Sequence, residues 1–200
     1  NDEKMSKSLG NSFFLKDFFV HYHGEVIRYY LMGIHYRVDF NFSDSGLSDA
    51  KNFIDKLYRL KQKVLLVSKK DNNADFTQIQ EALKDDLNIS KALACINELI
   101  SKYNETLDKE PKNKTIKQDI LSFIEFINNV FGLAYEEPYA YFKFGLSQDE
   151  IIKIDLLIDK RLKARANKDF KIADEVKIKL SKNGIKIMDM PDGTTLWEKI

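Results

Sequence analysis

The chain has 200 residues, of which 44% are apolar and 12% aromatic, so it is long enough for one or two globular domains. Its charges nearly cancel, with 32 basic against 31 acidic residues, so any signal for a polyanionic partner has to be local. A single cysteine excludes a disulfide framework and a CxxC-type zinc site, and no apolar run reaches the ~18 residues of a membrane helix. The polar start lacks the apolar stretch of a signal peptide, which predicts a cytoplasmic location and no membrane partner. Because the first residue is Asn rather than Met, we expect the chain to be a piece of a longer protein.

The first informative segment is Lys4–Ser8, which reads Lys-Met-Ser-Lys-Ser and continues with Leu-Gly-Asn. Two lysines three positions apart, with small hydroxyl residues beside them, form a flexible cationic clamp. Such a clamp can follow the β- and γ-phosphates of a nucleotide and offset the charge that builds on a leaving pyrophosphate. A disordered terminus rich in Lys and Ser is the alternative. We expect residues 1–12 to be mobile unless a nucleotide is present, because they offer little apolar surface to bury.

A long helical region follows. No glycine occurs between Lys51 and Phe131, and apolar residues recur at helical spacing over 50–67, 89–103 and 116–131. Gly132 is placed to cap the last of these runs, and a shorter helix fits 76–84. Amphipathic helices with short polar connections pack antiparallel, so we assign 1–45 to a loop and connecting segment and 46–146 to a helical bundle.

Residues 147–200 are predicted to form a small α+β module of their own, so that the whole fold is mainly α. An aromatic stretch around Pro138 and Gly145, with the composition of a packed linker, precedes it. Ser147 and Glu150 form a capping-box pattern that starts one helix, and a second runs from about 169 to 182. A Pro-Asp-Gly turn between two short apolar segments predicts a β-hairpin.

The charge of this last module differs from that of the rest. Residues 151–200 carry twelve basic and eight acidic side chains, whereas 1–150 carry twenty basic and twenty-three acidic. Ten of the basic residues are Lys160, Arg161, Lys163, Arg165, Lys168, Lys171, Lys177, Lys179, Lys182 and Lys186. Such a patch favours a polyanion through counterion release. Solvated helix faces without a partner are an equally good interpretation, because the chain has 27 Lys and only 5 Arg.

The Lys4–Ser8 segment resembles the KMSKS loop of class I aminoacyl-tRNA synthetases, and three later stretches narrow the resemblance to the cysteine–tRNA ligase family. Arg28–Ser43 contains RYYLM, HYR and NFS, which resemble that family's RYFLM, HYR and NYS. Asp86–Ala92 matches its DFNTPxA segment in part, with Leu for Phe and Ile-Ser for Thr-Pro. Gly184–Trp197 resembles its GI…D…GTTW ending. We identify the chain as a member of this family, namely its C-terminal portion from the KMSKS loop onward.

The resemblance implies a parent enzyme that activates cysteine with ATP and magnesium and transfers it to tRNA(Cys). Lys7 would stabilise the ATP phosphates as a catalytic residue with Lys4 assisting, and Ser6 and Ser8 would add hydrogen-bond donors to ATP.

The family's HIGH motif and cysteine-selecting zinc site lie upstream of the loop and are not in this chain. Zinc is therefore expected in the missing N-terminal half and no metal site in this chain, whose three histidines and Cys95 match no ligand spacing. Cys95 is interpreted as a small core residue. We expect the chain alone to form no adenylate, because one wall of an active site cannot preorganise a transition state.

In the family, the C-terminal domain reads the anticodon, and the matching positions are Arg165, Phe170, Asp174 and Asp189. An aromatic face, carboxylates and an arginine suit unstacked loop bases. Phe170 stands where the family usually has Trp, so a ring is kept and an indole N–H is lost. The alternatives are a core position for Phe170 and ordinary surface carboxylates for the two aspartates. Trp197 is assigned to the core of the module.

His35 and Arg37 belong to the HYR stretch, which the resemblance places near the tRNA, although a packed or capping histidine is as good an interpretation of His35. Two functions from other classes remain open from the sequence. One is a stand-alone tRNA-binding module, and the other is a structural helical bundle whose basic tail mediates protein contacts.

Overall fold

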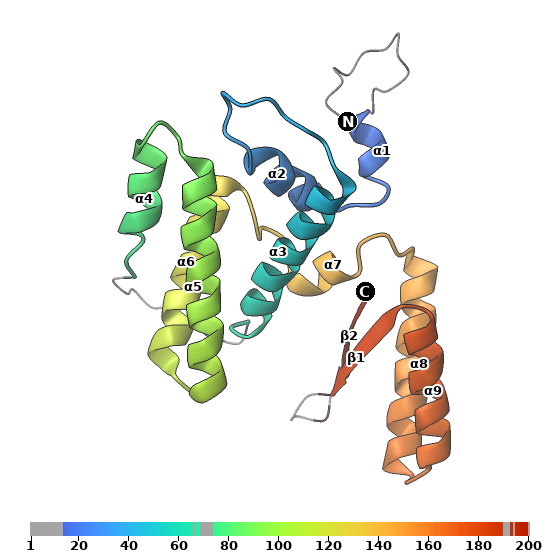
Figure 1. The fold of residues 1–200 in the computed structure, drawn as a ribbon. Helices are drawn as coiled ribbons and strands as arrows, with labels where there is room; N and C mark the ends of the chain where they lie inside the picture. Colours follow the sequence, from blue (N-terminus) through green and yellow to red (C-terminus); the bar gives the residue numbers. More distant parts are fainter. Residues whose placement is uncertain (1–13, 66, 69–73, 190–192, 194, 200) are drawn as a thin grey trace. The chain divides into compact units, whose positions relative to one another are not determined.

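The structure is a computed structural model that describes residues 14–65, 67–68, 74–189, 193 and 195–199. The Lys4–Ser8 segment and the expectation for residues 1–12 therefore lie outside the described residues. The described part consists of nine helices followed by one two-stranded antiparallel sheet (Figure 1), which confirms the mainly helical fold class. The chain divides into two compact units, the N-terminal unit Asn1–Pro138 and the C-terminal unit Tyr139–Ile200.

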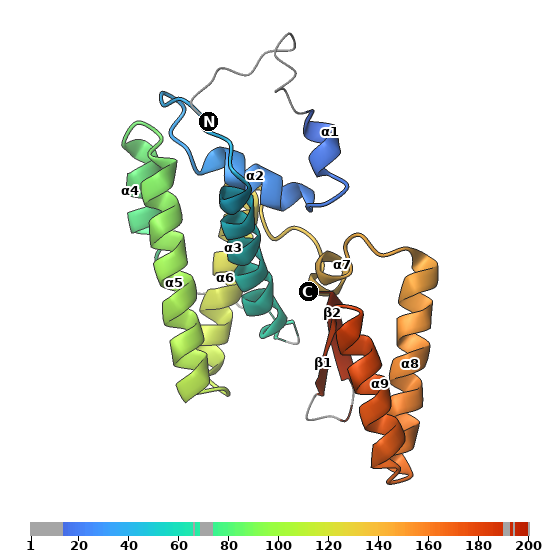
Figure 2. The same ribbon diagram turned by 45° about the vertical axis from the view of Figure 1, so that its right-hand side comes forward.

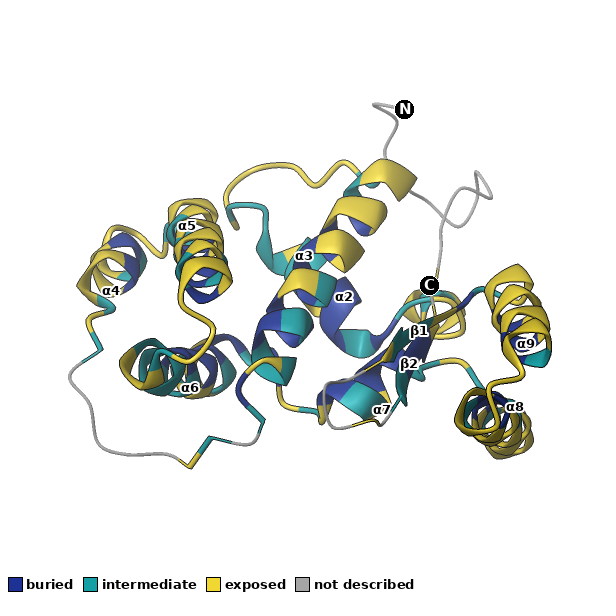
Figure 3. Cartoon of the chain, turned by 90° about the horizontal axis from the view of Figure 1, so that it is seen from below, coloured by how far each residue is buried: buried dark blue, intermediate teal, exposed yellow. Residues whose placement is uncertain are grey.

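The N-terminal unit begins with α1 (Leu15–Phe18), α2 (Gly24–Met32) and α3 (Asp44–Gln62). The side chains of His23 and Ser43 accept hydrogen bonds from backbone N–H groups in the first turns of α2 and α3. α4 (Thr77–Lys84), α5 (Ile89–Lys109) and α6 (Lys114–Phe131) complete the bundle. The helices α3 and α5 each have one buried and one exposed face, and α6 has a buried stripe flanked mostly by half-buried residues (Figure 3), as their apolar spacing predicts for the buried sides.

Gly132 ends α6 in the predicted way. Its φ of 65° is left-handed, and a Cβ at this position would come within 3.0 Å of the Arg28 Nε atom. That Nε atom donates a hydrogen bond to the carbonyl oxygen of Phe131 at 2.8 Å, so α2 holds the end of α6. Only glycine suits both the backbone angle and the close approach of Arg28.

A buried carboxylate extends this contact, and the sequence patterns do not reveal it. Glu25 in α2 is 1% exposed, and it accepts hydrogen bonds from the Tyr58 hydroxyl and the Ala134 backbone N–H, both at 2.5 Å. The Lys61 Nζ atom donates to the carbonyl oxygens of Ala134 and Glu136 at 2.9 and 2.6 Å. Side chains of α2 and α3 thus bind the backbone that leaves α6.

The C-terminal unit contains α8 (Gln148–Ala166), α9 (Phe170–Lys182), β1 (Ile185–Asp189) and β2 (Thr195–Lys199), with α7 (Pro138–Phe142) at its start. α8 and α9 lie side by side and antiparallel in both views (Figures 1 and 2). The capping box of Ser147 and Glu150 is present at the start of α8. β1 and β2 pair with Ile187 opposite Trp197, which confirms the predicted hairpin.

Trp197 lies in the core of this unit, as predicted. It is buried together with Ile154, Ile158, Val176, Leu180 and Ile185. Its indole N–H donates to the Asp155 carboxylate at 2.7 Å, and the Lys143 Nζ atom lies 4.4 Å from its ring centroid. The aromatic stretch before residue 147 therefore contributes to the compact unit, which begins eight residues before the predicted start of the module.

Candidate nucleic-acid interface

A hollow of about 410 Å³ opens on the surface of the C-terminal unit, where α8, α9 and the hairpin meet. Its lining residues are Leu162, Arg165, Ala166, Phe170, Asp189 and Gly193. Three of the four residues that the resemblance assigns to anticodon reading are thus brought together around one hollow. They come from the end of α8, the start of α9 and the end of β1.

Phe170 is the aromatic member of this group, and it faces solvent. It is the first residue of α9, directly after Asp169, whose side chain caps the helix by accepting from the Ile172 N–H at 3.2 Å. With 64% of its surface exposed, Phe170 is not a core residue, and that alternative is wrong. A large exposed ring beside a hollow provides a face on which a planar group can stack.

Asp189 is the acidic member, and its carboxylate is fully occupied. Arg161 donates to its two oxygens in a bidentate pair at 2.7 and 2.8 Å. Arg165 donates to Oδ2 at 2.6 Å, and the Thr195 hydroxyl donates to Oδ1 at 2.9 Å. These hydrogen bonds, Arg161 foremost, hold the pKa of Asp189 well below its usual range. A carboxylate has about four lone-pair sites, so a further donor would have to displace one of these partners.

Arg161 corrects the expectation of ten basic residues in one solvent-facing patch. It is 7% exposed, and the other nine residues of the patch are exposed. The hydrogen bonds to Asp189 raise its pKa, so the guanidinium stays charged and serves Asp189. The sequence does contain a signal for this. Ile154, Ile158 and Arg161 follow helical spacing, which puts Arg161 on the apolar face of α8.

Arg165 lies one turn after Arg161 and remains accessible. Its side chain is 44% exposed, and it makes one hydrogen bond, to Asp189, among the described residues. Since a guanidinium has five N–H donors, most of its donors stay open toward the hollow. Asp189 thereby fixes the position of a cation whose outer edge is free to bind an acceptor.

Asp174 is exposed and four positions after Phe170, so both lie on the same face of α9. It does not line the hollow, and its carboxylate contributes to the raised pKa of Arg161. Of the two predicted aspartates, Asp189 has its carboxylate filled by hydrogen bonds, whereas the carboxylate of Asp174 makes none to another described residue.

His35 and Arg37 belong to the N-terminal unit, where Asp86 draws them together. The Asp86 carboxylate accepts from the Tyr36 hydroxyl at 2.7 Å and from an Arg37 guanidinium nitrogen at 3.3 Å, and it lies 4.0 Å from the His35 Nε2 atom. The His35 Nδ1 atom accepts from the Arg37 backbone N–H at 3.3 Å, so His35 caps this turn. Two of the stretches that resemble the family, Arg28–Ser43 and Asp86–Ala92, are thus neighbours in space.

No group of three His, Cys, Asp or Glu residues able to hold a metal ion occurs in the described residues. Cys95 on α5 is half-buried, less completely than a core position would be. None of the described helices is both long and apolar enough to cross a membrane.

The Asp189 network leads to a pH prediction. We expect Asp189→Asn to destabilise the C-terminal unit by about 1–3 kcal/mol at neutral pH, less than a buried pair because Asp189 is partly exposed. Since folding lowers the pKa of Asp189, its contribution is complete well above the ordinary value of about 3.9 and is lost as the pH falls through the folded-state value. The difference between the two proteins should therefore shrink in acid.

Urea unfolding followed by the fluorescence of Trp197, the chain's only tryptophan, measures this unit. Asp159→Asn, an exposed carboxylate on α8, is the matched control and should change little. Equal stability of Asp189→Asn and the control at pH 7 would show that the network contributes nothing.

Comparison with known proteins matches two family models within the N-terminal unit, whereas the similarity to whole relatives extends over both units. The sequence model of the family described as tRNA synthetases class I (C) catalytic domain matches residues 1–52, and that of the DALR domain matches residues 78–136. The cysteine–tRNA ligase of Sulfurovum sp. (strain NBC37-1) is 49% identical over 200 residues, which are 100% of this chain and 43% of that protein. That of Sulfurimonas denitrificans is 47% identical over 199 residues, 99% of this chain and 42% of that protein. The cysteine–tRNA ligase of Helicobacter pylori (strain ATCC 700392 / 26695) is 46% identical over 199 residues, which are 100% of this chain and 43% of that protein. The chain spans less than half the length of these relatives.

Proposed function

Because the chain belongs to the family of cysteine–tRNA ligases, whose C-terminal part it matches, we propose that it is the tRNA-binding part of an enzyme that joins cysteine to tRNA(Cys). The observation that carries this proposal is the hollow at which Arg165, Phe170 and Asp189 meet. It combines an exposed ring with a positioned cation, which are the two groups that an unstacked base needs for stacking and for recognition of its acceptor edge.

Within this site the residues have different roles. Phe170 stacks on a base of the anticodon loop, and the open edge of Arg165 donates to base acceptors or to phosphate. Asp189 positions Arg165, because its own acceptor sites are already filled. Asp174, whose carboxylate makes no hydrogen bond to another described residue and which lies on the same face as Phe170, is the acceptor for a base amino group.

The nine exposed basic residues between Lys160 and Lys186 supply affinity without choice of base. Phosphate contacts of this kind fix the register of an RNA and make binding depend on salt, but they carry no sequence information. In the N-terminal unit, the match to the DALR domain supports binding of the anticodon side of the tRNA. His35 and Arg37 would contact the tRNA between its anticodon and its 3′ end.

The catalytic part of the proposal rests on the family. Lys7, assisted by Lys4, would stabilise the phosphates of ATP, with Ser6 and Ser8 as additional donors; all four lie outside the described residues. Magnesium would accompany ATP, and zinc would be held upstream of this chain. The 200 residues by themselves would bind tRNA and catalyse nothing.

Measurements of tRNA affinity distinguish the residues proposed to select bases from the basic residues proposed to bind phosphate. We expect Asp174→Ala to weaken binding of tRNA(Cys) by ~1–3 kcal/mol and to leave non-cognate tRNAs nearly unchanged. Lys179→Ala or Lys171→Ala should weaken all tRNAs about equally and lower the slope of log Kd against log salt by about 1. Filter binding or fluorescence anisotropy at several salt concentrations measures both effects. If the two kinds of variant behave alike, Asp174 does not select bases.

A further inference from the structure

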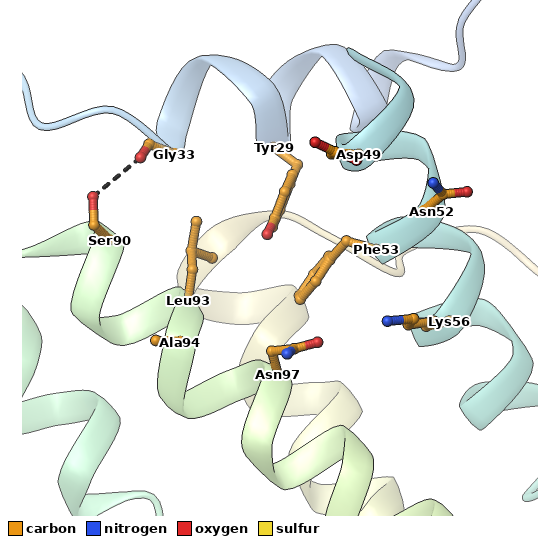
Figure 4. Close-up of a pocket in the computed structure, with 10 residues that line it drawn as sticks. All are labelled: Tyr29, Gly33, Asp49, Asn52, Phe53, Lys56, Ser90, Leu93, Ala94 and Asn97. Atoms are coloured by element: carbon orange, nitrogen blue, oxygen red, sulfur yellow. Dashed lines mark hydrogen bonds between the residues drawn. The ribbon is translucent and has the colours of Figure 1, made fainter. Parts of the chain in front are cut away.

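A second hollow, of about 550 Å³, lies within the N-terminal unit between α2, α3 and α5 (Figure 4). It shares no residue with the hollow of the C-terminal unit, and it contains none of the residues that the sequence singled out for function. Its volume falls within the roughly 300–1,000 Å³ typical of small-molecule sites. The space is therefore large enough for a ligand the size of a nucleotide.

Aromatic and aliphatic side chains form the walls. Tyr29 of α2 and Phe53 of α3 stack with their ring centroids 4.1 Å apart and their planes at 17°. Leu93 and Ala94 of α5 stand across from them (Figure 4). Phe53 and Leu93 are each only 6% exposed, so the apolar surface that a flat ligand would contact is that of the half-buried Tyr29 ring and the exposed Ala94.

Polar side chains surround these walls, and they make no hydrogen bonds to other described residues. Asp49, Asn52 and Lys56 come from successive turns of α3, and Asn97 comes from α5. Neither these four side chains nor the Tyr29 hydroxyl makes a hydrogen bond to another described residue. By contrast, Ser90 at the rim donates to the carbonyl oxygen of Gly33 at 3.1 Å. Five polar groups from three helices thus converge on one space without satisfying one another.

The chemistry of these groups indicates what they would bind. Two amides offer donors and acceptors side by side, which matches the edge of a nucleobase. Asp49 accepts from amino or hydroxyl groups, and burial together with the nearby Asp49 charge raises the pKa of Tyr29 to about 12, so its hydroxyl remains a donor. Lys56 is the one cation among the described residues that line the hollow, enough for a single phosphate and too little for a polyphosphate. A free amino acid would satisfy the two charges and leave most of the volume empty.

We propose that this hollow binds a nucleotide, with its base against Tyr29 and Ala94, the edge of the base on Asn52 and Asn97, and its phosphate on Lys56. The nucleotide is either an unstacked residue of an RNA or a free mononucleotide. Only the first of these sources rests on the proposed tRNA binding.

Titration with AMP, GMP, CMP and UMP, followed by NMR chemical shifts or calorimetry, tests the site directly. We expect at least one mononucleotide to bind, with affinity at least tenfold weaker in Asn97→Ala and Asn52→Ala and lost in Ala94→Trp, which fills the space. Glu98→Ala, an exposed neighbour outside the lining, should bind as the original chain does. The three exposed positions 52, 94 and 97 make no side-chain hydrogen bond with described residues, so the fold should survive their replacement, as circular dichroism would check.

Binding of tRNA(Cys) by the same variants identifies the source of the nucleotide. At least a tenfold loss of tRNA affinity in Ala94→Trp supports a nucleotide of the RNA, whereas unchanged tRNA affinity with mononucleotide binding supports a free ligand. If the original chain binds mononucleotides and no tRNA, this site stands and the proposed function fails. If no mononucleotide binds at millimolar concentration and Ala94→Trp leaves tRNA affinity unchanged, the nucleotide site is refuted.

Discussion

Replacing Glu25 by alanine is expected to lower the free energy of unfolding of the N-terminal unit by about 3–5 kcal/mol. The carboxylate is almost inaccessible and is the acceptor for the Tyr58 hydroxyl and the Ala134 N–H. Its removal leaves these buried groups without that acceptor and also opens a cavity, and both effects destabilise. Burial and the hydrogen bond to Glu25 raise the pKa of Tyr58, so the hydroxyl stays protonated and donates.

The conservative variant Glu25→Gln separates the two causes. The glutamine amide has the size of the carboxylate and keeps one acceptor oxygen. Its NH2 group would face the Ala134 backbone N–H, so two donors would meet where Glu25 accepts. We expect a loss of about 1–3 kcal/mol for it, the cost of one unsatisfied buried donor. Urea unfolding by far-UV circular dichroism reports on the helices of the N-terminal unit, and Trp197 fluorescence reports on the other unit. Glu81→Ala, an exposed residue paired only with Lys84 among the described residues, is the control. A Glu25→Ala protein as stable as this control would contradict the role of the network.

Replacing Lys7 by alanine in the full-length enzyme should slow adenylate formation by ~10²–10³, with a smaller change in the KM for cysteine. In its proposed role, Lys7 would stabilise the charge that develops on the leaving pyrophosphate, and such an interaction is strongest in the transition state. Cysteine-dependent ATP–pyrophosphate exchange measures the step.

Lys16→Ala is a matched control for Lys7, because Lys16 is an exposed lysine of α1 outside the loop. An unchanged kcat in Lys7→Ala would refute the role of Lys7. The same assay with the 200-residue chain should detect no exchange, and detectable exchange would show that the catalytic part of the proposal is wrong.

Much of the helical architecture could be predicted because its signals are local. The apolar spacing located α3, α5 and α6, the polar cap at Ser147 began α8, and Gly132 ended α6. The helices α1, α2 and α7 were not predicted, and residues 1–45 were assigned to a loop and connecting segment although α2 lies within them. α1 and α7 have four and five residues, too few for periodicity to become visible, and α2 has nine, shorter than the roughly 11–18 residues over which periodicity is read.

Side-chain networks were the part that could not be predicted. Glu25 and Ala134 are 109 positions apart, and nothing in the chain near either residue indicates that they meet. The same holds for Asp189. The resemblance implies that it accepts from a base, but nothing near it in the sequence indicates that two arginines already bind its carboxylate. Arg161 is the exception, because its place on the apolar face of α8 could have been read from spacing.

The central claim, that the Arg165 and Phe170 hollow selects anticodon bases, is tested most directly by one set of affinities. These are the Kd values of the original chain and of Arg165→Ala for anticodon stem-loops of tRNA(Cys), with the cognate anticodon and with each anticodon base changed in turn. We expect the original chain to lose ~1–3 kcal/mol for at least one base change and Arg165→Ala to bind the cognate and that changed stem-loop equally. Lys163→Ala, exposed on the same helix, should weaken both and keep the difference. An Arg165→Ala chain that still discriminates as the original chain does would contradict the account.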